Sequence, residues 1–278
     1  MFDPKTPRNP RVIAHRGGSL MRPENSYESF KYCADAGFEY VETDARLSSD
    51  GQVYLFHDLT LERVSDGKGK LSDYSSTELD ELTIHGSQRG PLRLRNVLED
   101  FPNLYLNIDA KTDDVVEPLL RVVQECAAVD RVLIASFSTS RLQRVRNICP
   151  DVATSLGQRE IAALVVASQL PPAAALRYLR KTTKWLEPAG IAQLGDSLQP
   201  AGGAAGSSKP VAVQVPLSYR AIPIVTKRFV SLSHALGLHV HVWTLNEAKQ
   251  IKQALAHGAD AIITDDPPLA KAILKDRI

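Results

Sequence analysis

The chain has 278 residues, of which 44% are hydrophobic and 23% are charged, and its formal net charge is +1. This is the balance of a soluble globular protein, and a chain of this length buries a sizeable core without disulfides or structural metals. A net charge this close to zero excludes a general nucleic-acid-binding surface and a strongly basic membrane-binding one, so any recognition of an anion must be local. The three cysteines, Cys33, Cys126 and Cys149, lack C-x-x-C spacing and are expected to be free thiols in a reducing compartment.

The N-terminal residues 1–11 are polar and include no apolar segment typical of a signal peptide. The longest apolar run, Ile161–Leu170, contains Ser168 and Gln169 and is too short to span a bilayer. We therefore expect a cytoplasmic protein without a transmembrane segment. The sequence leaves its oligomeric state open.

Short runs rich in β-branched residues alternate with amphipathic helical patterns along the whole chain. The runs predicted to be strands are Val12–His15, Tyr40–Asp44, Leu104–Asp109, Val132–Ser136, Ala153–Leu156, Val211–Val215, His239–Trp243 and Ala261–Thr264. The stretches predicted to be helices include Ser26–Ala36, Val115–Ala127, Ser138–Ile148, Pro223–Leu236, Asn246–Ala256 and Pro268–Leu274. Strand–helix alternation implies parallel strands joined by crossovers, and eight such units in about 250 residues match a (β/α)8 TIM barrel. The rival fold, a doubly wound open sheet, usually carries G-x-G-x-x-G after its first strand, and that motif is missing.

Two segments interrupt this alternation. Residues from about 45 to 100 are too long for a simple loop and contain a predicted hairpin and a polar stretch, so we expect a small insertion after the second strand. Residues 170–210 end in a tract of small residues, Gln199–Pro210, which is typical of a mobile loop. Neither segment marks a domain boundary, and the chain is predicted to be a single domain spanning residues 1–278.

Charged side chains concentrate where three predicted strands end. These groups are His15-Arg16, Glu42-x-Asp44 and Asp109-x-Lys111. In a (β/α)8 barrel the C-terminal strand ends form the functional face, and residues two apart on a strand point the same way. Three carboxylates that converge there would repel one another, so a hard cation is their natural partner. Because the set is all oxygen and contains no cysteine, it favours Mg²⁺ or Ca²⁺ over Zn²⁺.

A predicted hairpin adds a second histidine to this site. Asp50-Gly51 lies between alternating apolar runs, which is a strong signal for a two-residue turn. In that register Asp44 lies directly opposite His57, with Cβ atoms about 5 Å apart. By strand alternation the next residue, Asp58, points away from the site and is expected to be structural.

Together these residues predict the chemistry of phosphoryl transfer. One imidazole of the pair His15 and His57 would accept a proton from the nucleophile, and the other would donate one to the leaving alcohol. The metal ion, Arg16 and Lys111 would hold the phosphate and stabilise negative charge in the transition state. The sequence therefore indicates a metal-dependent phosphodiesterase that acts on a small-molecule phosphodiester.

In order and spacing, the motifs resemble the glycerophosphodiester phosphodiesterase family. They are His15-Arg16-Gly17, Pro23-Glu24-Asn25-Ser26, Glu42-x-Asp44, Asp50-Gly51, His57-Asp58, Asp109-x-Lys111, Ser136-Phe137, Val242-Trp243-Thr244-x-Asn246 and Ile263-Thr264-Asp265-x-Pro267. The likeness covers nearly the whole chain. It implies a (β/α)8 barrel that hydrolyses a glycerophosphodiester to glycerol 3-phosphate and an alcohol. The reaction routes that it allows include one through a cyclic phosphate formed by the glycerol hydroxyl.

The resemblance also implies a role for each site residue. The implied roles are an acid/base pair (His15, His57), metal ligands (Glu42, Asp44, Asp109) and phosphate contacts (Arg16, Lys111). The family more often has glutamate where Asp109 stands, so this ligand is one methylene shorter here, and Ser26 replaces the usual threonine.

Some positions allow two interpretations. Phe137 and Trp243, at strand ends, either wall the substrate pocket or belong to the core. Asn25 or Ser26 caps a helix, while Glu24 or Asn25 is a candidate for bracing the site.

Three alternative functions stay open. The same chemistry on a lysophospholipid would be a lysophospholipase D-type activity, with the run from Ile161 and the segment Tyr178-Leu179 to Trp185-Leu186 as a peripheral membrane-docking surface. A non-catalytic barrel would bind a phosphodiester or a metal without turnover. Related phospholipase C and sphingomyelinase D barrels form a third class, although the latter typically lack the arginine after the first histidine and the Pro-Glu-Asn signature. The leaving alcohol, the native metal and the assignment of acid and base are not decided by the sequence.

Overall fold

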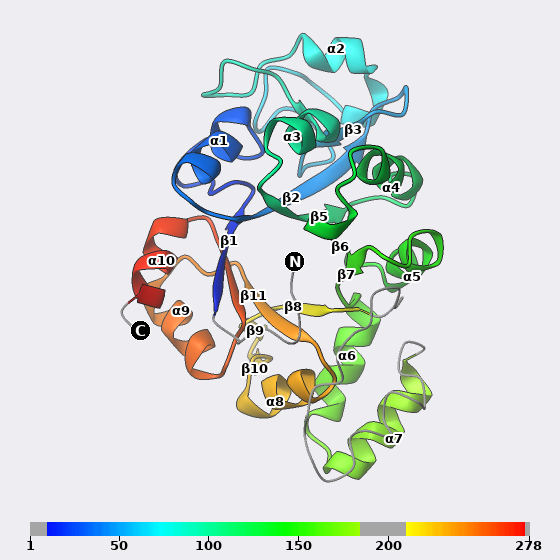
Figure 1. Cartoon of the computed structure of the whole chain (residues 1–278), viewed down its shortest axis with the longest axis vertical. Coiled ribbons are helices and arrows are strands. Elements are labelled where there is room, and N and C mark those ends of the chain that lie inside the picture. Colours follow the sequence, from blue (N-terminus) through cyan, green and yellow to red (C-terminus); the bar gives the residue numbers. More distant parts are fainter. Residues whose placement is uncertain (1–9, 184–209, 276–278) are drawn as a thin grey trace.

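A nearly closed barrel of parallel strands forms the centre of the protein (Figure 1). The computed structural model describes residues 10–183 and 210–275. The barrel strands are β1 (Arg11–His15), β2 (Tyr40–Leu47), β5 (Tyr105–Ala110), β6 (Val132–Ala135), β7 (Ala153–Thr154), β8 (Ala212–Pro216), β11 (His239–Trp243) and β12 (Ala261–Thr264). They lie in the order β7-β6-β5-β2-β1-β12-β11-β8, and the two edge strands meet through a parallel bridge between Ser155 and Ala212. The (β/α)8 fold is confirmed, and every predicted strand corresponds to one of these strands.

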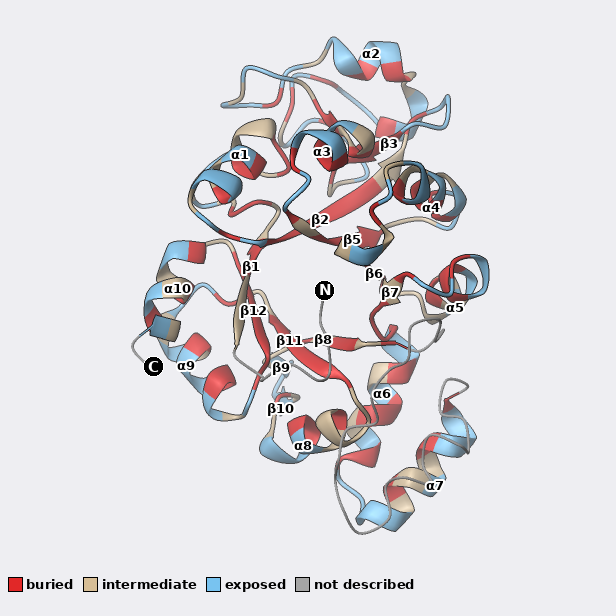
Figure 2. Cartoon of the chain, in the orientation of Figure 1, coloured by how far each residue is buried: buried red, intermediate tan, exposed pale blue. Residues whose placement is uncertain are grey.

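Helices cover the outside of the barrel, with their buried faces turned towards the strands (Figure 2). They are α1 (Tyr27–Asp35), α4 (Val116–Glu125), α5 (Thr139–Ile148), α6 (Gln158–Ala167), α8 (Lys227–Ala235), α9 (Ala248–Ala256) and α10 (Pro267–Lys275), while α7 (Pro172–Thr182) packs mainly against α6. The helix predicted over Pro223–Leu236 begins only at Lys227. The reason is that Ile222–Pro223 form strand β10, which pairs with β9 (Ser218–Tyr219) in a hairpin.

The segment after β7 folds into two helices, α6 and α7. Pro172 lies in the first turn of α7, where a missing backbone N–H has no helical partner to lose, so the proline pair starts this helix rather than ending it. Leu164 and Leu179 are buried and Ile161 and Tyr178 pack against the core, so these residues do not form the predicted docking surface. Trp185, Leu186 and the small-residue tract up to residue 209 lie outside the described residues. In residues 10–183 and 210–275, no helix combines the length and the apolar character needed to cross a membrane.

The barrel interior changes character from one end to the other. An inner apolar cluster includes Ile13 and Tyr40, and Arg11 lies over the Tyr40 ring at the N-terminal end. Tyr40 stacks on Tyr105 of the neighbouring strand, with ring centroids 5.0 Å apart. Because side chains alternate along β2, Glu42 and Asp44 point inward like Tyr40, but nearer the C-terminal end of the barrel. The inward carboxylates Glu42, Asp44 and Asp109 therefore gather at the C-terminal end of the barrel.

The hairpin after β2 has a different register from the predicted one. Strand β3 (Val53–Leu55) pairs antiparallel with the end of β2, and Val53 lies opposite Leu47. The Ser48 N–H donates to the Gln52 carbonyl at 3.0 Å, so the loop has three residues, 49–51, rather than two. Asp44 faces Phe56, whose N–H donates to the Asp44 carbonyl at 2.9 Å, and the predicted pairing of Asp44 with His57 is wrong.

Asp50 and Gly51 explain the longer loop. Gly51 has φ +82, the left-handed conformation that three-residue hairpin loops require at one position. The Asp50 carboxylate accepts hydrogen bonds from the Ser48 hydroxyl (2.6 Å) and from the Ser76 backbone N–H and hydroxyl (2.9 and 2.7 Å). Ser76 belongs to a distant helix, so this contact has no local sequence signal.

The rest of the segment between β2 and β5 contains a 3₁₀ helix (Leu71–Asp73), α2 (Ser76–Asp80), β4 (Leu92–Arg93) and α3 (Leu94–Asp100). Leu71 and Leu79, from the first two of these elements, join Tyr54 and Leu61 in a separate apolar cluster. Leu92 of β4 and Leu94 of α3 pack in the main core instead. The single-domain organisation of residues 1–278 stays a prediction.

Candidate active site

The C-terminal ends of β2 and β5 bring three carboxylates and a lysine together. Asp44 and Asp109 are direct neighbours in the parallel register of these strands. The Lys111 Nζ lies between them, 2.6 Å from Asp44 Oδ1 and 2.7 Å from Asp109 Oδ2. Glu42 lies two residues before Asp44 on the same face, and all three carboxylates are buried. The structure thus brings together these four residues, as predicted from strand alternation.

One ammonium group does not compensate three buried carboxylates. Burial and the neighbouring Asp44 charge raise the pKa of Glu42 to about 7. Burial also raises the pKa of Asp109, against the lowering effect of Lys111. For Asp44, the cost of burial is outweighed by Lys111, and its pKa is lowered. Asp109 Oδ1 is buried and has no hydrogen-bond partner. Three buried carboxylates therefore share the charges of Lys111 and the neighbouring Arg16, and Asp109 Oδ1 is an oxygen available to a cation.

The turn after β1 places Arg16 beside this cluster. Arg16 has φ +51, a conformation that costs a non-glycine residue about 1–3 kcal/mol and is typical of functional sites. Gly17 follows with φ +81, and a Cβ atom there would lie 2.4 Å from the Ser29 hydroxyl of α1, so only glycine fits. Arg16 Nε lies 3.5 Å from Asp44 Oδ2, and its NH1 donates to Glu24 Oε1 at 3.1 Å.

His15 is oriented by a carboxylate from the other end of the chain. Its Nδ1 lies 2.6 Å from Asp265 Oδ1, which follows β12, the strand beside β1. Asp265 in turn accepts from the Ser19 hydroxyl (2.5 Å) and the Asn246 side-chain amide (2.7 Å). His15 Nε2 lies 3.7 Å from Glu42 Oε2. Burial opposes a charge on His15, but the Glu42 and Asp265 carboxylates outweigh it and raise the pKa of the imidazole.

His57 lies just beyond the end of β3 and is oriented locally. Its Nδ1 is 2.6 Å from Asp58 Oδ1, so Asp58 turns towards the histidine and the prediction that it points away is wrong. Strand alternation fails here because β3 ends at Leu55. Arg63 donates to Asp58, and the Arg46 guanidinium donates to the His57 carbonyl at 2.9 and 2.7 Å. Burial lowers the pKa of His57, and the Asp58 contact offsets only part of this effect.

The Pro-Glu-Asn-Ser segment braces the site and caps a helix at the same time. The Asn25 amide donates to Asp44 Oδ2 at 3.2 Å and accepts from the Thr43 hydroxyl at 2.7 Å. Glu24 binds Arg63 at 2.7 and 2.8 Å in addition to its contact with Arg16. The helix cap is Ser26, whose hydroxyl accepts from the Ser29 N–H at the start of α1.

Phe137 and Trp243 differ in their surroundings. Their rings meet edge to face with centroids 6.0 Å apart, across the ends of β6 and β11. The Trp243 ring is half-buried and packs on the inner cluster of the barrel. Phe137 is 60% exposed, so it is not part of the core.

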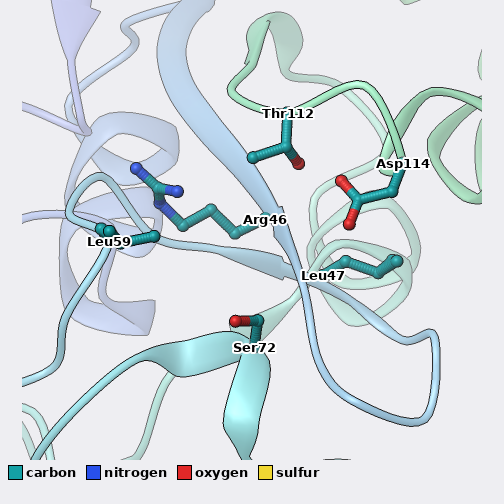
Figure 3. A pocket seen from close by; sticks show the side chains of 6 residues that line it. All are labelled: Arg46, Leu47, Leu59, Ser72, Thr112 and Asp114. Atoms are coloured by element: carbon teal, nitrogen blue, oxygen red, sulfur yellow. The ribbon is translucent and has the colours of Figure 1, made fainter.

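A small pocket of about 90 Å³ lies beside the carboxylate cluster. Arg46 and Leu47 of β2 form one side, and Thr112 and Asp114, which follow Lys111, face them across it (Figure 3). Asp114 is exposed, and Thr112 is half-buried.

Sequence reasoning found the charged cluster and missed the residues that orient the histidines. Asp265 and Asn246 both occur in motifs that carry the family resemblance. The motifs therefore indicate that these residues matter, but they do not indicate that Asp265 orients His15. Asp58 was assigned by strand alternation beyond the point where the strand ends. Among the described residues, no group of three or more His, Cys, Asp and Glu side chains is arranged to hold a metal ion as it stands, and Lys111 lies between two of the carboxylates.

Comparisons with known proteins cover nearly the whole chain. The glycerophosphoryl diester phosphodiesterase family matches residues 15–269. A probable glycerophosphodiester phosphodiesterase 2 of Mycobacterium tuberculosis is 30% identical over 266 residues, which cover 95% of this chain and 90% of the relative. A glycerophosphodiester phosphodiesterase of Bacillus altitudinis is 26% identical and covers 96% of this chain and 98% of its own length. A phosphodiesterase from Oleispira antarctica, solved in complex with the product sn-glycerol-3-phosphate, superposes with a TM-score of 0.72 at 22% identity and covers 96% of this chain and 97% of that one.

Proposed function

The chain belongs to the glycerophosphoryl diester phosphodiesterase family, and we propose that it hydrolyses glycerophosphodiesters to glycerol 3-phosphate and an alcohol. The observation that carries the proposal is the arrangement of the two histidines. His15 and His57 each have Nδ1 held 2.6 Å from a carboxylate, which leaves Nε2 of each ring for the substrate. Both rings feel the charges of the same carboxylate cluster, Glu42 for His15 and Asp44 for His57.

We assign the proton transfers to these two imidazoles. One accepts the proton of the attacking hydroxyl, which comes from water or from the substrate's glycerol, and the other donates a proton to the alcohol that leaves phosphorus. On the route through a cyclic phosphate, the two imidazoles exchange roles in the second step, when water opens the ring, and this restores the starting protonation state. Hydrolysis of a phosphodiester needs both proton transfers, because the attacking and the leaving atoms are both oxygens of an alcohol or of water.

Arg16 and Lys111 are the proposed phosphate contacts. Their side chains are only 16% and 15% exposed, and both lie against Asp44, which positions two fixed positive charges before the substrate arrives. Groups held in place in this way stabilise the charge of the transition state without rearranging. The half-buried Trp243 and exposed Phe137 are the proposed walls of the substrate pocket, since both lie at C-terminal strand ends.

The carboxylate cluster is the proposed site of a divalent cation. Asp109 Oδ1 is a buried oxygen without a hydrogen-bond partner, and burial, with the neighbouring Asp44 charge adding to it, raises the pKa values of Glu42 and Asp109. Glu42, Asp44 and Asp109 would hold the ion, and the all-oxygen set favours Mg²⁺ or Ca²⁺. When bound, the ion would supply positive charge next to the phosphate oxygens.

The free thiols of the protein support a reducing location. Cys33 and Cys149 are buried, Cys126 is half-buried, and none forms a disulfide among the described residues. Because disulfides are rare in the cytosol, we retain the cytoplasm as the proposed compartment.

The test is release of glycerol 3-phosphate from glycerophosphocholine by the purified protein, first with EDTA and then with Mg²⁺ or Ca²⁺ added back. We expect EDTA to abolish activity and the metal to restore it. The variant Asp109→Ala should need a metal concentration higher by about tenfold or more, because it removes one of three proposed ligands.

Two outcomes would contradict parts of this proposal. Full activity in EDTA would show that the reaction does not depend on a metal ion. An unchanged metal titration of Asp109→Ala would show that Asp109 is not a ligand. Folded, metal-supplemented protein that cleaves neither glycerophosphodiesters nor lysophospholipids would make the non-catalytic, phosphodiester-binding barrel the better reading.

A further inference from the structure

Arg46 binds the backbone of His57 at the point where the β2–β3 pairing ends. Strand β3 ends at Leu55, and the Phe56 N–H makes one further backbone hydrogen bond to β2, to the Asp44 carbonyl. One residue later, the His57 carbonyl accepts from two N–H groups of the Arg46 side chain, Nε at 2.9 Å and Nη2 at 2.7 Å. A side chain of β2 therefore holds this segment where the backbone pairing has stopped.

The two bonds from Arg46 fix a direction as well as a distance. Nε and Nη2 lie in one rigid plane, so a carbonyl oxygen that accepts from both has little freedom to move sideways. The donors belong to a charged group, and such hydrogen bonds are stronger than those between neutral groups. Burial lowers the pKa of Arg46, and the negative charges of Asp44, Asp58 and Asp109 offset part of this effect. Because Arg46 is half-buried, water competes less for its donors than it would at the surface.

Arg46 also connects the carboxylate cluster to the loop that carries His57. Asp44 and Arg46 are two residues apart on β2, so their side chains project to the same side of the strand. Figure 3 shows the guanidinium extending towards Leu59, two residues after His57, and away from Asp114 on the other side of the pocket. One strand therefore supplies a carboxylate to the cluster and, with its next side chain on that side, a contact to the histidine loop.

We propose that Arg46 is a positioning residue for His57: it sets the place of the His57 backbone relative to the carboxylates, whereas Asp58 sets the orientation of the ring. The inference rests on the proposed function, because the proton transfer assigned to His57 needs its Nε2 within hydrogen-bond distance of the substrate. A misplacement of about 1 Å lowers the rate of such a step by up to about a hundredfold. Arg46 does not touch the reacting atoms in this arrangement and acts only through His57.

The test is a double-mutant cycle between Arg46 and His57, with kcat and KM measured on glycerophosphocholine. The variants are Arg46→Met, His57→Ala and the double variant. His57→Ala removes the ring but keeps the carbonyl that Arg46 binds, so the cycle isolates the effect that passes through the ring. Arg46→Lys is added because it keeps the charge but offers one nitrogen instead of two.

Arg131→Met is the matched control. Arg131 is also half-buried and also donates to backbone carbonyls, those of Leu98 and Leu104. It directly precedes β6, at the end of the barrel away from the site. The control should therefore keep the wild-type kcat, whatever happens to its melting temperature.

A second readout does not need turnover. The NMR signal of the His57 ring Cε1–H is identified by its absence from His57→Ala. We expect it to shift or broaden in Arg46→Met and to stay as in the wild type in Arg131→Met. A wild type that is inactive on glycerophosphocholine would be a failure of the proposed function, and this signal would then decide whether Arg46 holds His57.

We expect Arg46→Met to lower kcat by about tenfold with KM nearly unchanged, and Arg46→Lys to lie between it and the wild type. In the His57→Ala background the same substitution should have no further effect on kcat. A rise in KM that persists without the ring would mean that Arg46 contacts the substrate directly, and equal losses of kcat in both backgrounds would mean a general effect on the fold. Either result would overturn the inference, as would an unchanged kcat or an unchanged His57 ring signal in Arg46→Met.

Discussion

The two histidines of the site are held in two different ways. His15 is 18% exposed, and its partner Asp265 lies 250 residues further along the chain, where Ser19 and Asn246 hold it in turn. His57 is 35% exposed, and its partner Asp58 is the next residue. One histidine is therefore oriented by closure of the barrel and the other by a loop.

The difference has an energetic consequence. The Asp265 carboxylate accepts three hydrogen bonds from side chains in a site that is largely shielded from water, and together these contacts lower its pKa against the cost of burial. The Asp58 carboxylate is held mainly by Arg63, which lowers the pKa of Asp58 to about 2. Arg63 is 47% exposed, so water can replace much of what it provides. We infer that the His15 side of the site is the rigid one and that the His57 side tolerates change better.

The largest expected effect tests whether both histidines belong to the reaction at all. His15→Ala and His57→Ala should each lower kcat on glycerophosphocholine by about 10²- to 10⁴-fold, because each removes one of two proton transfers. Thermal unfolding should show that both variants stay folded. If both variants keep near-normal rates, neither histidine is part of an acid/base pair. If only one variant does, the site has a single catalytic histidine.

The next prediction sharpens the comparison itself. Asp265→Asn should lower kcat by about 10- to 100-fold, the value of a charged hydrogen bond that is shielded from solvent, whereas Asp58→Asn should cost about tenfold or less. KM should change little in either variant, because neither carboxylate touches the substrate in the proposed arrangement. If Asp265 or Asp58 had only a structural role, its asparagine variant would have a lower melting temperature and an unchanged kcat.

Asp260 provides the control for Asp265. The two residues flank the same strand, β12, and each binds a histidine: Asp260 Oδ2 lies 2.8 Å from His234 Nε2 at the end away from the site. Asp260→Asn should lower the melting temperature, because this carboxylate is buried and also accepts from the Val240 N–H at 2.7 Å, while kcat stays unchanged. If Asp58→Asn proves as damaging as Asp265→Asn, the loop is as rigid as the barrel and the comparison fails.

The contrast between local contacts and contacts with distant parts of the chain also explains what could be predicted from the sequence. The barrel and the cluster of Glu42, Asp44, Asp109 and Lys111 follow from strand patterns and from alternation within strands, which are local rules. The predicted barrel makes the first and last strands neighbours, but no local pattern indicates that Asp265, just past the end of β12, turns towards His15.

Local rules also fail where a strand ends or where a distant contact decides. The register of the β2–β3 hairpin depends on Asp50 binding Ser76, so a turn signal read from two residues misplaced His57 by one position. The orientation of Asp58 could not be read from alternation, because β3 ends at Leu55 and the chain turns before His57.

The smallest expected effect probes the loop side alone. Arg63→Ala removes the contacts that connect Asp58 to Glu24, and through Glu24 to Arg16. Since exposed ion pairs contribute at most about 1 kcal/mol, kcat should fall by no more than about fivefold. Arg144→Ala is the matched control: Arg144 is 45% exposed and pairs with Glu117 on the outer helices, so its loss should leave kcat unchanged. A fall of a hundredfold in Arg63→Ala would mean that the exposed Arg63 network, rather than the half-buried Asp265 carboxylate, determines how the histidines are oriented towards the phosphate.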